Sequence, residues 1–159
     1  GYKGGLIYDQ ELQLDCSKFV EVSDKLIPTG KFLSVEENPV FDFRKPKLLG
    51  KDIEKTGNGY DHAYCVDDFD GHLKKFAVLK DPESGRTMTV STTLPGCQVY
   101  TGNWIEGSVG KNGFVHKRHG AVCLETESYP DTPNHPEIPS CIVTPDKQYH
   151  EITVYKFDF

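Results

Sequence analysis

Short segments with the residue pattern of β-strands recur along this chain, separated by glycine and proline, and this punctuation limits the fold more than any other feature. Residues 73–80 and 86–93 are joined by the turn-forming sequence D-P-E-S-G, which predicts a hairpin with a five-residue loop. In residues 11–16, Leu and Cys alternate with Glu, Gln and Asp, as expected for a strand with one buried face. Further strand candidates are residues 31–35, 63–66, 98–101, 120–126 and 151–157.

These strands predict an all-β fold. Many short strands with turn signals between them favour an antiparallel β-sandwich or barrel. The single helical pattern is short, at residues 51–55. No linker, repeat or low-complexity segment divides the chain, so residues 1–159 are expected to form a single body, which also suits being part of a larger sheet system.

The charge pattern argues against a nucleic acid partner, and the lack of long apolar runs argues against a membrane partner. The net charge is -6, and the 18 lysines and arginines are scattered rather than gathered in the basic stripe that nucleic acid binding needs. No apolar run approaches the roughly 20 residues that cross a bilayer. Residues 1–10 also lack the apolar stretch of a secretory signal. We therefore predict no nucleic acid partner and no membrane partner.

The five cysteines are odd in number, widely spaced and free of any C-x-x-C pair. This pattern argues against a disulfide framework and a zinc site, and it predicts a reducing, cytoplasmic location. The sequence also contains no glycine-rich phosphate loop, no G-x-S-x-G turn and no H-E-x-x-H motif. We therefore expect neither a cofactor nor a metal ion.

Three polar motifs contain residue types that can act on a ligand. The sequence G-N-G-Y-D-H places Asp61 beside flexible glycines at the start of a strand, although a turn capped by Asp has the same pattern. Gln98, followed by Tyr100 and Trp104, would offer a sugar an amide and aromatic faces, although such aromatics are more often core or rim residues. Glu125 ends a short apolar segment before a turn-rich stretch, where it is placed either to reach a ligand or to remain a rim charge.

The histidines carry weaker signals. His116 and His119 flank Lys117 and Arg118 in a polar run, which predicts a solvated loop. Their spacing matches no complete set of metal ligands.

Taken together in chain order, seven segments of this sequence resemble the galactose mutarotase (aldose 1-epimerase) family. The likeness extends from about Ile7 to Phe157, and the combination is specific although each motif alone is weak. The segments are L-I-P-T-G at 26–30, F-D-F-R-K-P at 41–46 with L-G at 49–50, G-Y-D-H at 59–62, P-G-C-Q-V-Y-T-G-N at 95–103, C-L-E-T at 123–126, P-D at 130–131 with Asn134, and the ending at 149–157.

The resemblance implies a large antiparallel β-supersandwich that interconverts the α and β anomers of an aldose without cofactor or metal. It implies that Glu125 is the general base, that Asp61 contacts sugar hydroxyls and that Gln98 lines the site. These residue types suit the chemistry, because opening a hemiacetal ring removes a proton from the anomeric hydroxyl and delivers one to the ring oxygen. Each positioned transfer is typically worth about 10²–10⁴-fold in rate.

Two departures from the family pattern stand out. The residue after Thr126 is usually Gln in the family and is Glu127 here. If Glu127 faces the same side as Glu125, their repulsion raises the apparent pKa of the pair; a twist at the strand end would instead turn it to solvent. The family's acid histidine, in an N-H-x-Y-F-N-L motif, lies upstream of all the matched segments and has no counterpart here.

The chain therefore resembles the C-terminal half of the enzyme, and its expected partners are an aldose sugar and the N-terminal half. That half is either a separate chain or the rest of a longer enzyme, unless the chain is a remnant that binds sugar without catalysis. The long open edges of a lone half-sandwich favour the first two alternatives.

Two rival functions stay open. A hexose-6-phosphate mutarotase on the same fold would need an arginine cluster, and the sequence has only Arg44, Arg86 and Arg118, far apart. A non-catalytic carbohydrate-binding β-sandwich would use Asp61 and Gln98 with nearby aromatics as a sugar platform. The preferred aldose, galactose or glucose, is not specified by these motifs.

Overall fold

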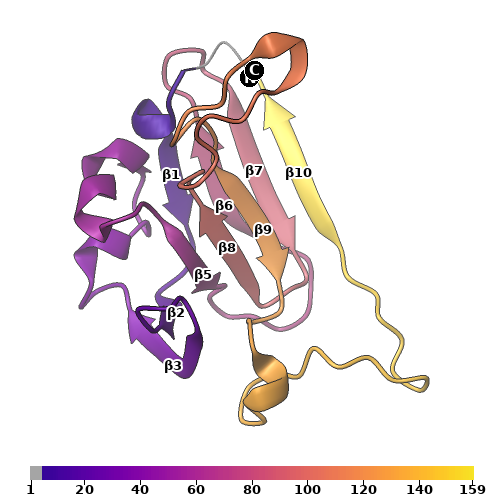
Figure 1. The fold of residues 1–159 in the computed structure, drawn as a ribbon. Helices are drawn as coiled ribbons and strands as arrows, with labels where there is room; N and C mark the ends of the chain where they lie inside the picture. The colour runs from indigo at the N-terminus through magenta and orange to yellow at the C-terminus, as the bar shows by residue number, and fades with distance from the viewer. Residues whose placement is uncertain (1–4) are drawn as a thin grey trace.

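A computed structural model describes residues 5–159 of the chain, and the regular secondary structure in this range is almost entirely β-strand, with long loops between the strands (Figure 1). The helical segments in this range are short 3-10 turns. The strands are β1 (Glu11–Leu14), β2 (Lys18–Val22), β3 (Pro28–Ser34), β4 (Lys47–Leu48), β5 (Asp61–Cys65), β6 (Lys74–Lys80), β7 (Thr87–Thr92), β8 (Gly96–Tyr100), β9 (Cys123–Glu127) and β10 (Thr153–Asp158). The 3-10 turns are η1 (Ile7–Asp9), η2 (Pro39–Phe41), η3 (Leu49–Lys51), η4 (Ile53–Thr56), η5 (Lys111–Gly113) and η6 (Thr132–Asn134).

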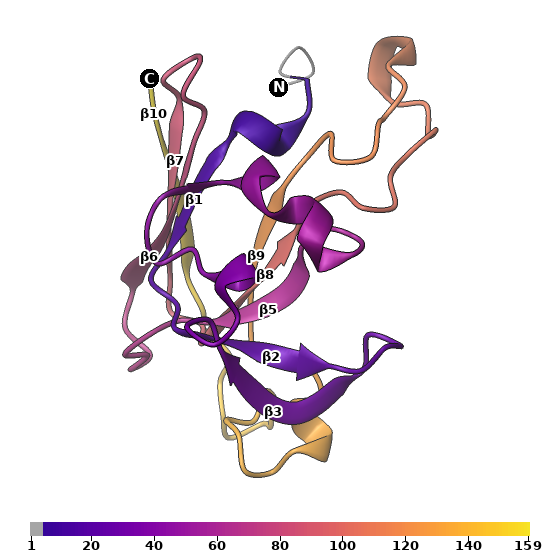
Figure 2. The same cartoon turned by 90° about the vertical axis from the view of Figure 1, so that its left-hand side faces the viewer.

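The strands form two antiparallel sheets of five strands each, in the orders β10-β7-β6-β1-β4 and β3-β2-β5-β8-β9. Figure 2 shows the sheets as two layers, with β1, β6, β7 and β10 in one and β5, β8 and β9 in the other. The hairpin of β2 and β3 extends sideways from the second layer. The predicted antiparallel β-sandwich is confirmed.

The core lies between the two layers because strands such as β1, β7 and β8 direct their apolar side chains toward the opposite layer. In β1 the burial alternates as the sequence predicts, with Leu12 and Leu14 fully buried. The buried set from the remaining strands includes Phe19, Tyr64, Phe76, Ala77, Val90, Cys97, Val99 and Leu124.

An aromatic cluster closes one side of the sandwich. Phe43 is fully buried, with its ring centroid 5.0 Å from that of Tyr60 and 6.3 Å from that of Tyr64. The Tyr60 hydroxyl donates to the Val40 carbonyl at 3.1 Å, which ties β5 to the segment around η2. In Figure 1 the turns η2 to η4 lie at the left, on the side opposite β9 and β10.

Local sequence pattern predicts some of these elements and misses others. The hairpin of β6 and β7 is confirmed, with Leu79 opposite Met88 in its register. Strand β2 was missed because Phe19 and Val20 are adjacent and both buried, which breaks the period of two. The expected helical segment at 51–55 is occupied by 3-10 turns.

We expect Phe43→Ala to lower the free energy of unfolding by about 3–5 kcal/mol, because it leaves a cavity among buried rings. Urea denaturation measures this change. Phe69→Ala is the matched control, because Phe69 is 40% exposed. A loss below about 1 kcal/mol in Phe43→Ala would contradict a central role for the aromatic cluster.

Candidate active site

Three adjacent strands bring the predicted site residues together. In the register of β5, β8 and β9, Ala63 lies opposite Gln98, and Gln98 lies opposite Glu125. Directly opposed residues project from the same face of a sheet, and so do residues two apart on one strand. Asp61, two residues before Ala63, therefore shares a face with Gln98 and Glu125. The opposite face of these strands is buried in the core.

A hydrogen bond joins two of these side chains. The Gln98 amide donates from Nε2 to Asp61 Oδ1 at 2.6 Å, and both residues are partly buried. The bond fixes the Gln98 amide, which retains a second N–H and its carbonyl oxygen for other partners. Glu125 is exposed beside them. The site thus presents two carboxylates and an amide on one open surface, a donor and acceptor set suited to sugar hydroxyls.

The strand that carries Asp61 is held by a buried polar network. The Tyr60 N–H donates to Thr101 Oγ1 at 2.9 Å, and Asn103 Nδ2 donates to the Tyr60 carbonyl at 3.0 Å. Thr101 Oγ1 donates to Asn103 Oδ1 at 2.7 Å. Gly59 has φ +98, and a Cβ there would collide with the Asn103 side chain. The G-Y-D-H and T-G-N segments therefore hold this turn and position Asp61 at the start of β5.

His62 lies on the other face of β5 from Asp61. Its ring packs 4.5 Å from that of Phe41 and 5.7 Å from that of Phe19, measured between centroids. Nδ1 accepts the Asp61 N–H at 3.0 Å. Burial lowers the pKa of His62, and the charge of Asp61 opposes this shift only in part. The imidazole of the G-Y-D-H motif is therefore a packing group.

The aromatic residues of the predicted sugar platform lie at the upper end of the same surface. Tyr100 is directly opposite Asp61 in the register of β5 and β8. Its hydroxyl accepts the backbone N–H of Trp104 at 3.0 Å, and Trp104 is 65% exposed. Asp61, Gln98 and Glu125 are called the polar row below. Tyr100 adds an aromatic ring to the face that carries this row.

Glu127 faces the same side as Glu125, which answers the question left open by the sequence. It lies opposite Gly96, while Glu125 lies opposite Gln98. Burial, and next the charge of Glu125, raise the pKa of Glu127 to about 7 from an ordinary value of 4.5. At neutral pH the protonated and ionised forms of this carboxyl are therefore both populated.

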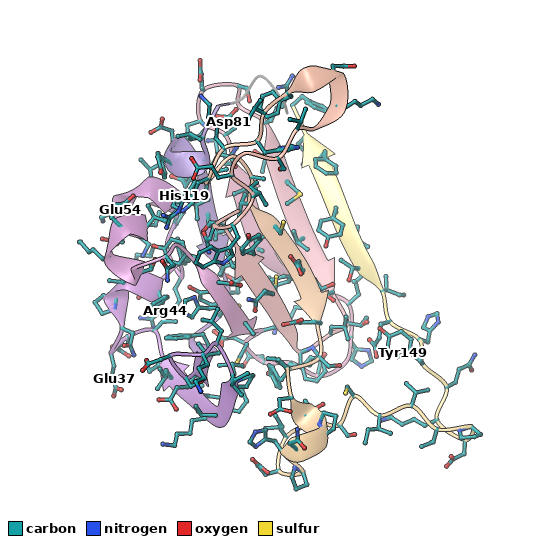
Figure 3. The ribbon with its side chains drawn as sticks, in the orientation of Figure 1. Glu37, Arg44, Glu54, Asp81, His119 and Tyr149 are labelled. Atoms are coloured by element: carbon teal, nitrogen blue, oxygen red, sulfur yellow. The ribbon has the colours of Figure 1, made fainter. Side chains whose placement is uncertain are left out.

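The expected solvated loop is confirmed at Lys117 and Arg118, which are exposed, but the expectation was wrong for His119. His119 is buried, and its Nδ1 lies 3.0 Å from the Tyr8 hydroxyl. The Ile7 N–H donates to the His119 carbonyl at 3.0 Å, so this residue ties the loop before β9 to η1, where Figure 3 labels it. Burial and the neighbouring Arg118 charge lower the pKa of His119. His119 is buried by contacts with residues distant in sequence, such as Tyr8, so the polar sequence around it did not predict its burial.

The arginines do not assemble a phosphate site. Arg44 forms a two-point ion pair with Asp42, 3.0 and 2.9 Å long, near the edge of β1 and β4. Arg118 donates to His119 Nε2 at 3.2 Å, and Arg86 lies in the β6–β7 turn, near the labelled Asp81 in Figure 3. A surface hollow of about 960 Å³ beside Arg44 lies away from the polar row of β5, β8 and β9.

Within residues 5–159, no group of three His, Cys, Asp or Glu side chains is arranged to hold a metal ion. The same part of the chain contains no helix long and apolar enough to span a bilayer. All five cysteines are free thiols, and three of them are buried.

The fold and the polar row define a β-sandwich protein with a carboxylate-bearing open face. A sequence model of the family described as aldose 1-epimerase matches residues 2–156. The chain belongs to the aldose 1-epimerase family, as its motifs predicted.

Curated relatives show the same kinship. The chain is 40% identical to galactose mutarotase of Mus musculus over 154 residues, which cover 95% of this chain and 44% of that protein. It is 39% identical to galactose mutarotase of Homo sapiens over 155 residues, with the same shares. Aldose 1-epimerase of Escherichia coli is 30% identical over 158 residues, covering 95% and 45%. The chain thus spans less than half the length of these relatives.

Solved structures show the same fold. A GalM/aldose epimerase homologue from C. elegans superposes with a TM-score of 0.85 at 24% identity, covering 96% of this chain and 46% of that chain. Galactose 1-epimerase from Lactobacillus acidophilus gives a TM-score of 0.72 at 21% identity, covering 98% and 45%.

The pKa of Glu127 predicts a specific pH dependence of stability. The folded state binds this proton more tightly than the unfolded state, so the free energy of unfolding falls as the pH rises from about 4.5 through about 7. Glu127→Gln removes this loss. The Tm of the variant relative to the wild type should therefore increase between pH 4.5 and pH 8, as measured by thermal unfolding.

The exposed Glu106 supplies the matched control, because Glu106→Gln removes the same group from the loop after β8. The same pH trend in both variants would mean that overall charge, and not the burial of Glu127, controls the effect.

Proposed function

We propose that this chain forms the base-carrying half of an aldose 1-epimerase that acts on galactose or glucose. The observation that carries the proposal is the row of Asp61, Gln98 and Glu125 on one face of three neighbouring strands. Membership of the family supports it, as do the names of the galactose mutarotases that the chain resembles.

In this proposal Asp61 and Gln98 bind sugar hydroxyls and hold the anomeric carbon beside Glu125. The exposed Glu125 carboxylate removes the proton of the anomeric hydroxyl, the C1–O5 bond breaks, and the ring oxygen receives a proton. Rotation about C1–C2 then presents the other face of the aldehyde to the ring hydroxyl. Reclosure with the reverse proton transfers gives the other anomer, without a cofactor.

The rival functions find less support. The dispersed arginines, two of them bound within the chain, do not suit a phosphorylated sugar. A sugar-binding module without catalysis could also use the Glu125 carboxylate to accept hydrogen bonds from sugar hydroxyls, so the measurement of anomer exchange below decides between the two functions. The five free thiols suit a reducing compartment, so we place the enzyme in the cytoplasm, in galactose metabolism.

We further infer that the rest of an epimerase domain packs against the β9–β10 side. These strands end the two sheets, and they lie together because Tyr155 Oη donates to the Leu124 carbonyl at 2.8 Å. Beyond them the described strands leave both backbone edges open, which natural sheets normally cover.

This side exposes several apolar side chains, beside the Lys156–Asp158 ion pair. On β10 and just beyond it, Val154, Phe157 and Phe159 are exposed. A hollow of about 190 Å³ is lined by Leu79, Met88 and Phe157, and the first two also pack against the core. Since relatives are more than twice as long as the matched segment, the remaining portion of such a domain is the partner that this surface suits.

Co-expression tests this surface. The portion of mouse galactose mutarotase outside the aligned segment should form a one-to-one complex with this chain in size-exclusion chromatography. Phe157→Glu should weaken the complex roughly thirty-fold, because burying a phenylalanine contributes about 2 kcal/mol. Phe69→Glu changes an exposed phenylalanine in the β5–β6 loop and should leave the affinity unchanged. Self-association through β10 in place of the complex would contradict the proposal.

Activity tests the base. The complex should accelerate anomer exchange of freshly dissolved α-D-galactose above the buffer rate, followed by polarimetry. Glu125→Gln should reduce the enzymatic rate by about 10²–10⁴-fold, because it removes the proton acceptor. Glu106→Gln should retain the full rate. Galactose binding without any acceleration would favour the non-catalytic module instead.

A further inference from the structure

The strand that carries Glu125 is the last strand of its sheet. Among the strands of residues 5–159, β9 pairs with β8 alone, so a backbone ladder holds it from one side only. Glu125 lies in the middle of β9, opposite Gln98. A side chain that acts on a bound ligand has to be held within about 0.5 Å of its productive position. The position of Glu125 therefore depends on contacts from outside its own sheet.

Strand β10 of the other sheet supplies one such contact just before Glu125. Figure 2 places β10 and β9 in different layers, so a bond between them crosses the sandwich. The Tyr155 hydroxyl on β10 donates to the Leu124 carbonyl at 2.8 Å. This carbonyl belongs to the planar peptide group that joins Leu124 to Glu125. The bond therefore restrains the backbone at Glu125 itself.

A second contact from β10 lies just after Glu125. The hydroxyl oxygens of Thr126 and Thr153 are 2.6 Å apart. Thr153 Oγ1 in turn lies 3.3 Å from Thr92 Oγ1 on β7, and Thr92 Oγ1 accepts the Leu94 N–H at 3.1 Å. Thr92 is buried, so this chain of hydroxyl groups ends in the core. Strand β10 thus holds β9 on both sides of Glu125.

The two contacting side chains of β10 are well supported. Thr153 and Tyr155 are two residues apart on the strand and so project from the same face. Strand β10 pairs with β7 along its whole length, with Tyr155 opposite the fully buried Val90. Asp61 and Gln98 lie on other strands and are joined by their own hydrogen bond. The support from β10 therefore acts on the strand of the base rather than on the pair that binds sugar.

We propose that Tyr155 and Thr153 are positioning residues for Glu125, which they hold from the opposite sheet so that its carboxylate meets the anomeric hydroxyl. The proposal rests on the proposed epimerase function. Neither side chain takes part in proton transfer, because both act through the backbone and side chains of β9. A displacement of about 1 Å can slow an enzymatic reaction by about 10²-fold, so the loss of these hydroxyl groups should appear in the rate.

The test is the kinetics of anomer exchange, measured on the chain alone and on its complex with a saturating amount of the uncovered portion of mouse galactose mutarotase. Tyr155→Phe keeps the ring and removes only the hydroxyl, and Thr153→Val replaces a hydroxyl with a methyl group. In the form that turns over, each should lower kcat per folded molecule by about fivefold, and the double variant by about twenty-fivefold. The KM for galactose should stay at the wild-type value, because Asp61 and Gln98 keep their places. Circular dichroism at the assay temperature gives the folded fraction.

Tyr149→Phe is the matched control, because Tyr149 is 61% exposed in the segment that leads to β10, where Figure 3 labels it. This variant should match the wild type, and an equal loss in Tyr149→Phe and Tyr155→Phe would overturn the proposal. A wild-type kcat in the double variant would overturn it too. So would a rise in KM as large as the fall in kcat, since the contacts would then support the whole site rather than the base.

The same measurements separate this proposal from the function on which it rests. If the wild type accelerates exchange, Glu125→Gln does not and the double variant retains the wild-type kcat, the positioning role is wrong and the epimerase function stands. If the wild type accelerates exchange in neither form, both proposals are wrong.

Discussion

The alternation of side chains across β5, β8 and β9 is the constraint on which the site depends. One face of these strands carries Tyr64, Val99 and Leu124, all buried in the core. A slip of one residue in any pairing would expose these side chains and drive carboxylates into the interior, so burial fixes the register. The row of Asp61, Gln98 and Glu125 on the outer face is a consequence of that register. The same pairings place Gln98 opposite Ala63 on β5 and opposite Glu125 on β9.

The core constrains the site from a second direction, through the turn that precedes β5. Tyr60 is buried with its ring in the aromatic cluster, while its backbone groups bond to Thr101 and Asn103. The same residue therefore anchors the turn and determines where Asp61 begins its strand. The packed ring of Tyr60 and the hydrogen bonds of its backbone therefore hold the same turn, because a buried backbone N–H or carbonyl needs a hydrogen-bond partner.

The two sides of the sandwich differ in a way that relates to the length of the relatives. On one side the turns η2 to η4 cover the space between the sheets, with Phe43 at the centre. On the other side the edges of β9 and β10 are open, and apolar residues such as Phe157 are exposed. A domain completed on that side would also shelter the end of β9 that carries Glu125 and Glu127, linking assembly to the chemistry of the site.

Local patterns in the sequence determined the β class, the main hairpin and the family, because alternation, turn residues and motif order are encoded by near neighbours. They also singled out Asp61, Gln98 and Glu125, whose catalytic and binding roles remain predictions. The tertiary structure alone decided that His119 is buried, that His62 packs against Phe19 and Phe41 and that Glu127 has a raised pKa. Each of these outcomes depends on contacts between distant segments, which no local pattern of residues records.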